Sequence, residues 1–174
     1  MLYTSWIHSA LGKLLLASDG THLTGLWLEG QKYFATSLTD ESTEKPDLPL
    51  FAATQRWIDD YFAGKKPAIS ALPLAPAGSD FRKAVWDILC TIPYGQTITY
   101  GEIAKKVATQ RNESHMSSQA VGGAVGHNPI SIIIPCHRVV GANGSLTGYA
   151  GGIDKKIKLL ELESTKPFSY SFSN

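Results

Sequence analysis

The sequence contains no long hydrophobic run and very little cysteine. In its 174 residues no stretch approaches the roughly 18 apolar residues that a membrane-spanning helix needs. The N-terminus also lacks the charged start and cleavage signature of a signal peptide. The two cysteines, Cys90 and Cys136, are too few for a disulfide framework and are not spaced as zinc ligands are. We therefore expect a cytoplasmic protein that binds no metal and no membrane.

Nucleotide-binding glycine motifs are missing as well. Neither the dinucleotide fingerprint nor the Gly-Lys-Ser/Thr ending of a phosphate-binding loop occurs. The glycine-rich stretch 146–152 instead predicts either the flexible wall of a pocket for a flat ligand or an ordinary connector. With 43% hydrophobic residues, the chain can bury a core as one compact unit or as two small domains.

The charges are unevenly distributed along the chain. Residues 1–76 carry six Lys/Arg and eight Asp/Glu, a net charge of −2, whereas residues 77–174 carry ten and seven, a net charge of +3. A polyphosphate partner would therefore meet the second segment, unless these cations only keep the surface soluble. The candidate cations are Arg82, Lys83, Lys105, Lys106, Arg111, Arg138, Lys155, Lys156 and Lys158.

The first half of the chain shows strand patterns followed by a helix pattern. Three runs of alternating apolar and polar residues, 2–9, 12–18 and 22–29, predict a meander of strands. From Leu50 the apolar spacing becomes helical and predicts a helix that covers the sheet and ends at Gly64. Its apolar positions are Phe51, Trp57, Ile58, Tyr61 and Phe62. The polar stretch 36–49 predicts a surface loop.

A linker divides the chain near residue 77, because Pro73, Pro76 and Gly78 interrupt any regular element there. We expect two domains, residues 1–76 and 77–174. Ser79 then caps a helix that stops at the Pro93-Tyr94-Gly95 turn. Its expected buried positions are Phe81, Val85, Trp86, Leu89 and Cys90, and Cys90 is interpreted as a core residue.

Two short helices joined by a polar turn follow in the second domain. Thr99 opens the first, and the second covers residues 117–126 with a serine at its start. This arrangement predicts a helix-turn-helix-like motif. The glycines and alanines of the second helix permit close approach of another backbone, which either tight protein packing or DNA would explain.

The segment that follows carries the reactive groups. A β-branched run, 130–134, predicts a buried strand that ends at Cys136, beside His137 and Arg138. Positive charge there can lower the pKa of the thiol, although a buried structural cysteine is the alternative. Neighbours on an extended segment point to opposite faces, so His137 would act through a water. Either Glu161 or Glu163 could orient the histidine.

The combined motifs closely resemble the methylated-DNA–protein-cysteine methyltransferases. They are Ile134-Pro135-Cys136-His137-Arg138-Val139, preceded by Gly126-His127-Asn128-Pro129 and followed by Leu146-Thr147-Gly148-Tyr149-Ala150-Gly151-Gly152. The resemblance covers residues 81–163, whereas residues 1–76 match only in general pattern. It implies an α/β (α+β) fold, with an RNase H-like N-terminal domain and a mostly helical C-terminal domain that carries a helix-turn-helix.

The resemblance also implies an activity: irreversible transfer of the alkyl group from O6-alkylguanine, and also from O4-alkylthymine, to Cys136. His137 would be the water-mediated base and Glu163 the carboxylate that orients it. Asn128 would brace the turn between the DNA-binding helix and the active site, and Tyr100 would contact the flipped guanine and protonate it. No cofactor is implied.

The implied partner is double-stranded DNA containing an alkylated guanine, bound through the minor groove by a monomer. Small residues on the second helix would fit a groove only about 6 Å wide. The residues implied in substrate and DNA binding are Gln119, Ala120, Gly123, Arg138, Val139, Tyr149 and Ala150. Ala124 would also approach the groove.

Gln119 departs from the family pattern, in which the best-known members carry an arginine that fills the gap left by the flipped nucleotide. Glutamine lacks the charge, so we expect weaker DNA binding without loss of chemistry. Two alternatives remain at this point: a non-catalytic alkyltransferase-like protein that binds DNA damage, and a cysteine hydrolase that uses Cys136 and His137.

Overall fold

The computed structural model describes residues 1–164 and 171–172. The chain forms two compact units. The first consists of Met1–Ala77 together with Pro129–Ile133, and the second of Gly78–Asn128 and Ile134–Asn174. Residues 129–133 thus belong to the first unit, whereas the sequence division placed them in the second domain.

The first unit is built on a four-stranded sheet. Its strands are β1 (Tyr3–Ser9), β2 (Gly12–Ser18), β3 (Leu23–Leu28) and β4 (Thr43–Glu44), in the order β3-β2-β1-β4. The first three strands pair antiparallel, which confirms the predicted meander, and β4 pairs parallel with β1. The predicted loop 36–49 therefore contains one short strand and ends where Pro49 begins a helix.

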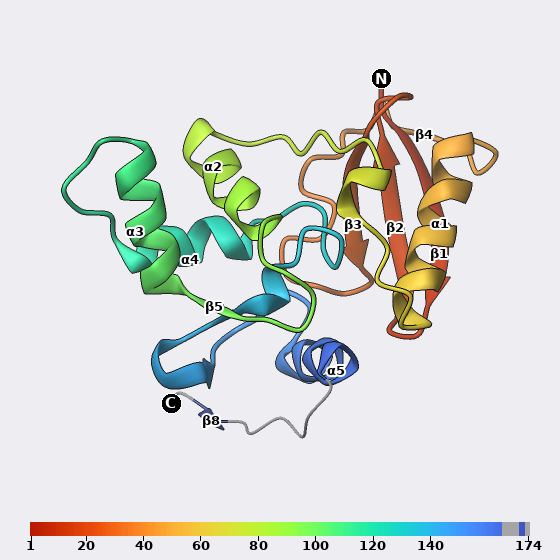
Figure 1. The fold of residues 1–174 in the computed structure, drawn as a ribbon. Coiled ribbons are helices and arrows are strands. Elements are labelled where there is room, and N and C mark those ends of the chain that lie inside the picture. The colour runs from red at the N-terminus through yellow and green to blue at the C-terminus, as the bar shows by residue number, and fades with distance from the viewer. Residues whose placement is uncertain (165–170, 173–174) are drawn as a thin grey trace. The chain divides into compact units, whose positions relative to one another are not determined.

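Helix α1 (Pro49–Phe62) lies along this sheet, as Figure 1 shows. Its apolar spacing buries Phe51, Trp57, Ile58 and Tyr61, as predicted, while Phe62 stays half-buried. The indole of Trp57 stacks on Tyr61 and donates a hydrogen bond to the carbonyl of Ala68, 2.8 Å away. The short helix η1 (Ile69–Ala71) follows.

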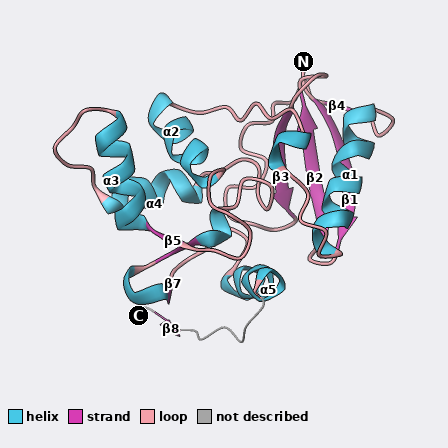
Figure 2. Ribbon diagram, viewed as in Figure 1, coloured by secondary structure: helices cyan, strands magenta, loops and turns pink. Residues whose placement is uncertain are grey.

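The second unit is mostly helical (Figure 2). Its α-helices are α2 (Asp80–Leu89), α3 (Tyr100–Gln110), α4 (Ser118–Gly126) and α5 (Ile153–Glu163), and its 3-10 helices are η2 (Cys136–Arg138) and η3 (Ala142–Gly144). Its short strands are β5 (Ile98–Thr99), β6 (Val139–Val140), β7 (Ser145–Leu146) and β8 (Ser171–Phe172). Strand β5 pairs with β6, and β7 pairs with β8, both in parallel.

Side-chain caps set the starts of three of these helices. Ser79 accepts a hydrogen bond from the Arg82 amide, and Ser117 accepts hydrogen bonds from the second and third residues that follow it. Thr99 forms a full capping box with Glu102. The predicted starts of α2, α3 and α4 are therefore confirmed. Helices α2 and α3 both pack on α4, consistent with the helix-turn-helix-like arrangement.

The indole of Trp86 fixes α2 against α4, because it is buried and donates a 2.9 Å hydrogen bond to the Ala124 carbonyl. Cys90 caps the C-terminal end of α2 and is half-buried rather than fully in the core. Phe81 is also only half-buried. The expected core face of α2 is therefore correct at Val85, Trp86 and Leu89 and wrong at its two ends.

The predicted strand over 130–134 is wrong. The run is completely buried, but only Ile130 forms a bridge, with Leu26, and the next residues form turns. Ile132 has a φ of +70°, a left-handed conformation that interrupts any strand and is rare for a β-branched residue. Burial thus explains the hydrophobic composition without a strand.

Among the described residues, no helix combines the length and the apolar character required to cross a bilayer. The C-terminal tail after Glu163 lies mostly outside the described residues. Of that tail the structure describes Ser164 and the two residues of β8.

Candidate active site

Cys136 begins η2. The sequence had predicted that this cysteine ends a strand, and that prediction is wrong. Its backbone amide donates to the Ile134 carbonyl, 2.8 Å away, and only 5% of the residue surface is exposed. The Pro135 that precedes it lies outside the helical region of backbone space. Cys136 therefore lies on a tight turn and is almost enclosed by its surroundings.

Asn128 connects the two points where the chain leaves and re-enters the second unit. The chain departs after Asn128 and returns at Ile134, and the Asn128 side-chain amide donates to the Ile134 carbonyl at 2.9 Å. This bond lies two residues before Cys136. Because Asn128 is buried, the bond fixes the start of the turn that carries the thiol.

His137 and Glu163 are brought together from distant parts of the chain. His137 Nε2 lies 2.5 Å from Glu163 Oε2, and both side chains are almost completely buried. Of the two acidic candidates, Glu163 therefore contacts the histidine, whereas Glu161 is exposed. A carboxylate on Nε2 orients the ring and holds a proton on that nitrogen.

Glu163 is itself held by several donors. Its Oε1 accepts from Arg138 Nε at 2.6 Å and from the Gly95 amide at 3.3 Å. Gly95 has a φ of +81°, and a Cβ there would lie 3.0 Å from the Glu163 carbonyl, so only glycine fits. The Pro93-Tyr94-Gly95 turn, interpreted from sequence only as a helix stop, thus contributes a donor to the carboxylate.

Arg138 was expected among the DNA-contacting residues, and the structure corrects this. The side chain is buried, with Nε on Glu163 and a second nitrogen 2.7 Å from the Ile92 carbonyl. Its guanidinium also lies over the ring of Tyr94. The charge therefore serves the carboxylate within the second unit and is not on the surface where a phosphate would bind.

The ionisation of this network follows from burial and pairing. Burial raises the pKa of Glu163, but hydrogen bonds and charge from His137 and Arg138 outweigh it and lower that pKa to about 2. Burial lowers the pKa of His137, although the Glu163 hydrogen bond and charge oppose the shift. The imidazole is therefore neutral at neutral pH and able to accept a proton.

The thiol is not activated in the way the sequence suggested. Burial raises the pKa of Cys136, and this effect exceeds the lowering by the side chain of Asn128 and by the charge of Lys156. Arg138 points away, to Glu163. At rest the thiol is therefore protonated, and its ionisation requires a base.

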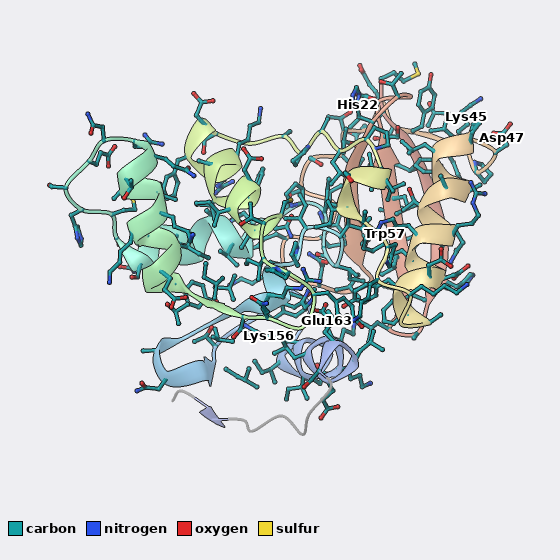
Figure 3. All side chains as sticks on the ribbon, viewed as in Figure 1. His22, Lys45, Asp47, Trp57, Lys156 and Glu163 are labelled. Atoms are coloured by element: carbon teal, nitrogen blue, oxygen red, sulfur yellow. The ribbon has the colours of Figure 1, made fainter. Side chains whose placement is uncertain are left out.

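Lys156 was counted from sequence among the surface cations, but it is fully buried. Its ammonium donates to the Val139 carbonyl at 2.6 Å, and burial lowers its pKa to about 8. Lys156 and Glu163 both project from α5 (Figure 3). Both lie on the buried face of that helix with Leu159 and Leu160, at intervals of three and four residues. This spacing is the sequence signal that could have identified Lys156 as a buried residue.

Tyr100 begins α3, and its hydroxyl lies 2.9 Å from the Thr147 hydroxyl. Tyr149 lies two residues after Thr147 in the 146–152 loop. Its hydroxyl is buried, and it lowers the pKa of the Cys136 thiol. Val139 is buried with its carbonyl on Lys156, and Ala150 is half-buried. Tyr149 therefore lies beside the thiol, and Tyr100 and Thr147 lie close to each other.

Helix α4 exposes Gln119, Ala120 and Gly123. These three expected DNA-binding residues are therefore all accessible, whereas the catalytic candidates Cys136, His137 and Glu163 are buried. Ala124, also expected to approach the groove, is buried, and its carbonyl binds Trp86. In the part of the chain that the structure describes, no three His, Cys, Asp or Glu side chains are grouped as a metal site would require.

Comparison with protein families gives two matches that together cover most of the chain. Residues 2–76 match the ribonuclease-like domain of 6-O-methylguanine DNA methyltransferase, and residues 80–165 match its DNA-binding domain. The expected fold, a ribonuclease-like N-terminal domain followed by a helical DNA-binding domain, is thereby confirmed.

Curated relatives are similar over almost their whole length. The methylated-DNA–protein-cysteine methyltransferase of Methanosarcina acetivorans is 43% identical over 169 residues, which cover 94% of this chain and 99% of the relative. The protein of the same name from Haemophilus influenzae is 40% identical over 162 residues, 93% of this chain and 86% of the relative.

Solved structures agree with these relatives. Mycobacterium tuberculosis OGT in complex with DNA is 42% identical, with a TM-score of 0.80 over 94% of this chain and 92% of that one. The O6-methylguanine DNA methyltransferase of Methanococcus jannaschii is 31% identical, with a TM-score of 0.64 over 98% and 99%.

Proposed function

The chain belongs to the methylated-DNA–protein-cysteine methyltransferase family, and from this premise we propose that Cys136 is the residue that accepts the alkyl group from O6-alkylguanine. The protein is a DNA-binding methyltransferase of DNA repair. The observation that carries the assignment of Cys136 is its place beside a neutral His137 whose Nε2 is bonded to the buried Glu163.

His137 is the base in this proposal, and Glu163 and Arg138 keep it ready. Because Nε2 is engaged with Glu163, Nδ1 is the ring nitrogen that receives the thiol proton, through a bridging water. The imidazolium that forms is stabilised by the ionised Glu163, whose carboxylate Arg138 and Gly95 hold in position. Lys156 contributes a positive charge that favours the thiolate.

The transfer itself is a single in-line displacement at a saturated carbon. A lone pair of the Cys136 sulfur forms the S–C bond while the electrons of the C–O bond move to the guanine oxygen. The proton that Tyr100 gives to the base prevents the departure of a guanine anion. The thioether that results has no hydrolytic route back to the thiol, so one molecule repairs one lesion.

The pocket for the base is proposed to lie along β6 and the 146–152 loop. The Val139 carbonyl, which accepts from Lys156, offers its second lone pair to the base edge, Ala150 offers backbone groups, and Tyr149 lies beside them. Asn128 keeps the turn between α4 and the thiol in place through its bond to Ile134. O4-alkylthymine, which presents an alkylated oxygen on a smaller ring, is the second substrate that we propose.

On the DNA side, we propose that α4 enters the minor groove and that the damaged nucleotide rotates out of the duplex. The exposed Ala120 and Gly123 permit the approach, and Gln119 occupies the gap in the base stack. The protein acts as a monomer. Residues 78–128 and 134–174 carry both DNA binding and chemistry, and residues 1–77 with 129–133 form the other domain.

Excess duplex with a single O6-methylguanine tests the stoichiometry. Chromatography of the digested DNA should show restored guanine in an amount equal to the protein and then no more, and a second duplex with O4-methylthymine tests the other substrate. Continued turnover would contradict the suicide mechanism. Rotation of the base is tested separately, since a fluorescent 2-aminopurine beside the lesion should brighten when the neighbouring base leaves the stack.

A further inference from the structure

Two hydroxyl groups from distant elements meet in the second unit. Tyr100 is the first residue of α3, and Thr147 lies in the 146–152 loop, 47 positions along the chain. Their oxygens are 2.9 Å apart, and both side chains are partly buried. The loop is proposed to line the base pocket, and Tyr100 is proposed to protonate the base. This hydrogen bond therefore connects the two.

The backbone around Thr147 leaves its hydroxyl little choice of direction. A Cβ built on Gly141 would lie 3.1 Å from the Thr147 methyl carbon, so this methyl packs closely on the Gly141 backbone. A β-branched side chain has few χ1 rotamers, and fixing the methyl therefore also fixes the hydroxyl. The hydroxyl is then directed at Tyr100.

The ring of Tyr100 is restrained on another side. Gly122 of α4 faces this ring, since a Cβ there would lie in ordinary van der Waals contact, 3.9 Å from two of its carbons. Helix α4 lies beside the ring, and the hydroxyl is hydrogen-bonded to Thr147. Tyr100 is therefore oriented before any substrate arrives.

We infer that Thr147 is a positioning residue for the alkyl transfer, which donates its hydrogen bond to the Tyr100 oxygen and so directs the tyrosine proton toward the departing base. The inference rests on the proposed function, in which Tyr100 protonates the guanine. If Tyr100 instead donated to Thr147, its only proton would be engaged and the base would receive none.

The same hydrogen bond makes Tyr100 a better proton donor. Burial raises the pKa of the Tyr100 hydroxyl, the bond with Thr147 lowers it, and the nearby Cys136 raises it as charge develops on sulfur. Of these three influences, Thr147 is the one that stabilises the phenolate. The other charged groups of the site, Glu163, Arg138 and Lys156, shift the pKa values of Cys136, His137 and Tyr149.

The protons and electrons of the step balance. The thiol proton goes to His137, the sulfur lone pair forms the S–C bond, and the C–O electrons go to the guanine oxygen. The Tyr100 proton then neutralises the guanine, and the phenolate accepts the Thr147 hydrogen bond until solvent returns a proton. No oxidant, reductant or further reactant is required.

Thr147→Val tests the inference, because valine keeps the methyl on Gly141 and removes only the hydroxyl. The rate of methyl transfer from an O6-methylguanine duplex should fall by about three- to tenfold, the value of one neutral hydrogen bond. Thr147→Ser keeps the hydroxyl but lacks the methyl that fixes its direction, and it should lose less of the rate than Thr147→Val. Alkylation of Cys136 by iodoacetamide needs no proton from Tyr100 and should be unchanged in both variants.

Tyr100→Phe completes the comparison. Added to Tyr100→Phe, the valine substitution should slow transfer no further, because its target hydroxyl is gone. An equal slowing with and without the Tyr100 hydroxyl would show a mere packing defect and overturn the inference, as would a wild-type rate in Thr147→Val.

A readout without DNA separates this inference from the proposed function. In an NMR titration of the tyrosine ring carbons, Thr147→Val should raise the pKa of Tyr100 relative to the wild type, and Thr147→Ser should raise it less. An unchanged pKa overturns the inference even if the wild type accepts the methyl group. A wild type that accepts none contradicts the proposed function, while the titration still decides whether Thr147 donates to Tyr100.

Discussion

Lys156 shows how one buried charge can assist the thiol. Its ammonium is held on the Val139 carbonyl, and its charge lowers the pKa of Cys136 against the opposing effect of burial. We predict that Lys156→Met slows the reaction of Cys136 with iodoacetamide at neutral pH by a factor of about three to ten. The second-order rate constant, measured by mass spectrometry, checks this.

The pH dependence of that difference identifies its cause. Because the pKa of Lys156 is about 8, the charge is present below this pH and absent above it, so the two rates should converge as the pH rises past 8. Lys158→Met makes the same chemical change at an exposed position of the same helix and should leave the rate unaltered. Equal slowing in both variants would refute a local charge effect.

The sequence and its family resemblance pointed to Cys136, His137 and Glu163 but assigned Lys156 and Arg138 to the surface. The reason is that a cation in a sequence is interpreted by its usual preference for water, and only the fold supplies the carbonyl and carboxylate that compensate its burial. The interaction of Tyr100 with Thr147 was equally out of reach, since it depends on how a loop folds back onto a helix.

At the scale of single elements, the cap of α3 connects helix stability to the site. Thr99 and Glu102 form its capping box, and Tyr100 is the next residue. We predict that Thr99→Ala lowers the free energy of unfolding by about 1 kcal/mol. It should also slow methyl transfer, because the cap no longer fixes the first turn of α3, where Tyr100 lies. Urea unfolding and single-turnover rates measure the two effects.

Ser79→Ala is the matched control for this prediction. Ser79 caps α2 in the same way, through the Arg82 amide, but no proposed site residue follows it. The two variants should lose similar stability, whereas the transfer rate should fall only in Thr99→Ala. A comparable drop in rate for Ser79→Ala would mean that general destabilisation, and not the position of Tyr100, controls the chemistry.

Helix α4 should gain affinity for DNA when its missing charge is restored. Gln119 is exposed near the start of the helix. We predict that Gln119→Arg tightens duplex binding and steepens the dependence of log K on log salt by about one. Gln110→Arg adds the same charge at the exposed end of α3 and should change both quantities less. No change in Gln119→Arg would disprove the assigned position.

The helices could be predicted because their caps and apolar spacing are local features. Ser79, Thr99 and Ser117 accept the hydrogen bonds expected of helix caps. The run 130–134 could not be predicted, because β-branched residues suit any buried segment and only the left-handed Ile132 ends the strand. Which unit this run would join is a tertiary property that no local pattern encodes.

At the scale of the whole molecule, Glu163 should control stability in acid. Its folded pKa is about 2, against 4.5 for the ordinary carboxyl, so the unfolded chain binds the proton first as the pH falls. The contribution of Glu163 is therefore complete above about pH 4.5 and disappears toward pH 2, a loss of roughly 3 kcal/mol. Urea unfolding at a series of pH values measures it.

Glu163→Gln is the variant that isolates this contribution, since it cannot titrate. Its stability should fall less steeply than that of the wild type between about pH 5 and pH 2. Glu161→Gln, which removes an exposed carboxylate from the same helix, is the matched control. Parallel curves for the wild type and Glu163→Gln would contradict the buried ion pair with Arg138.

The central claim is that Cys136 itself becomes alkylated. Intact-protein mass spectrometry after incubation with a duplex that contains one O6-methylguanine tests it directly, with Cys136→Ser as the control. We predict a stoichiometric gain of one methyl group in the wild type and none in the control. An unchanged wild-type mass, with the damaged duplex still bound, would contradict the claim and favour a non-catalytic protein that binds DNA damage.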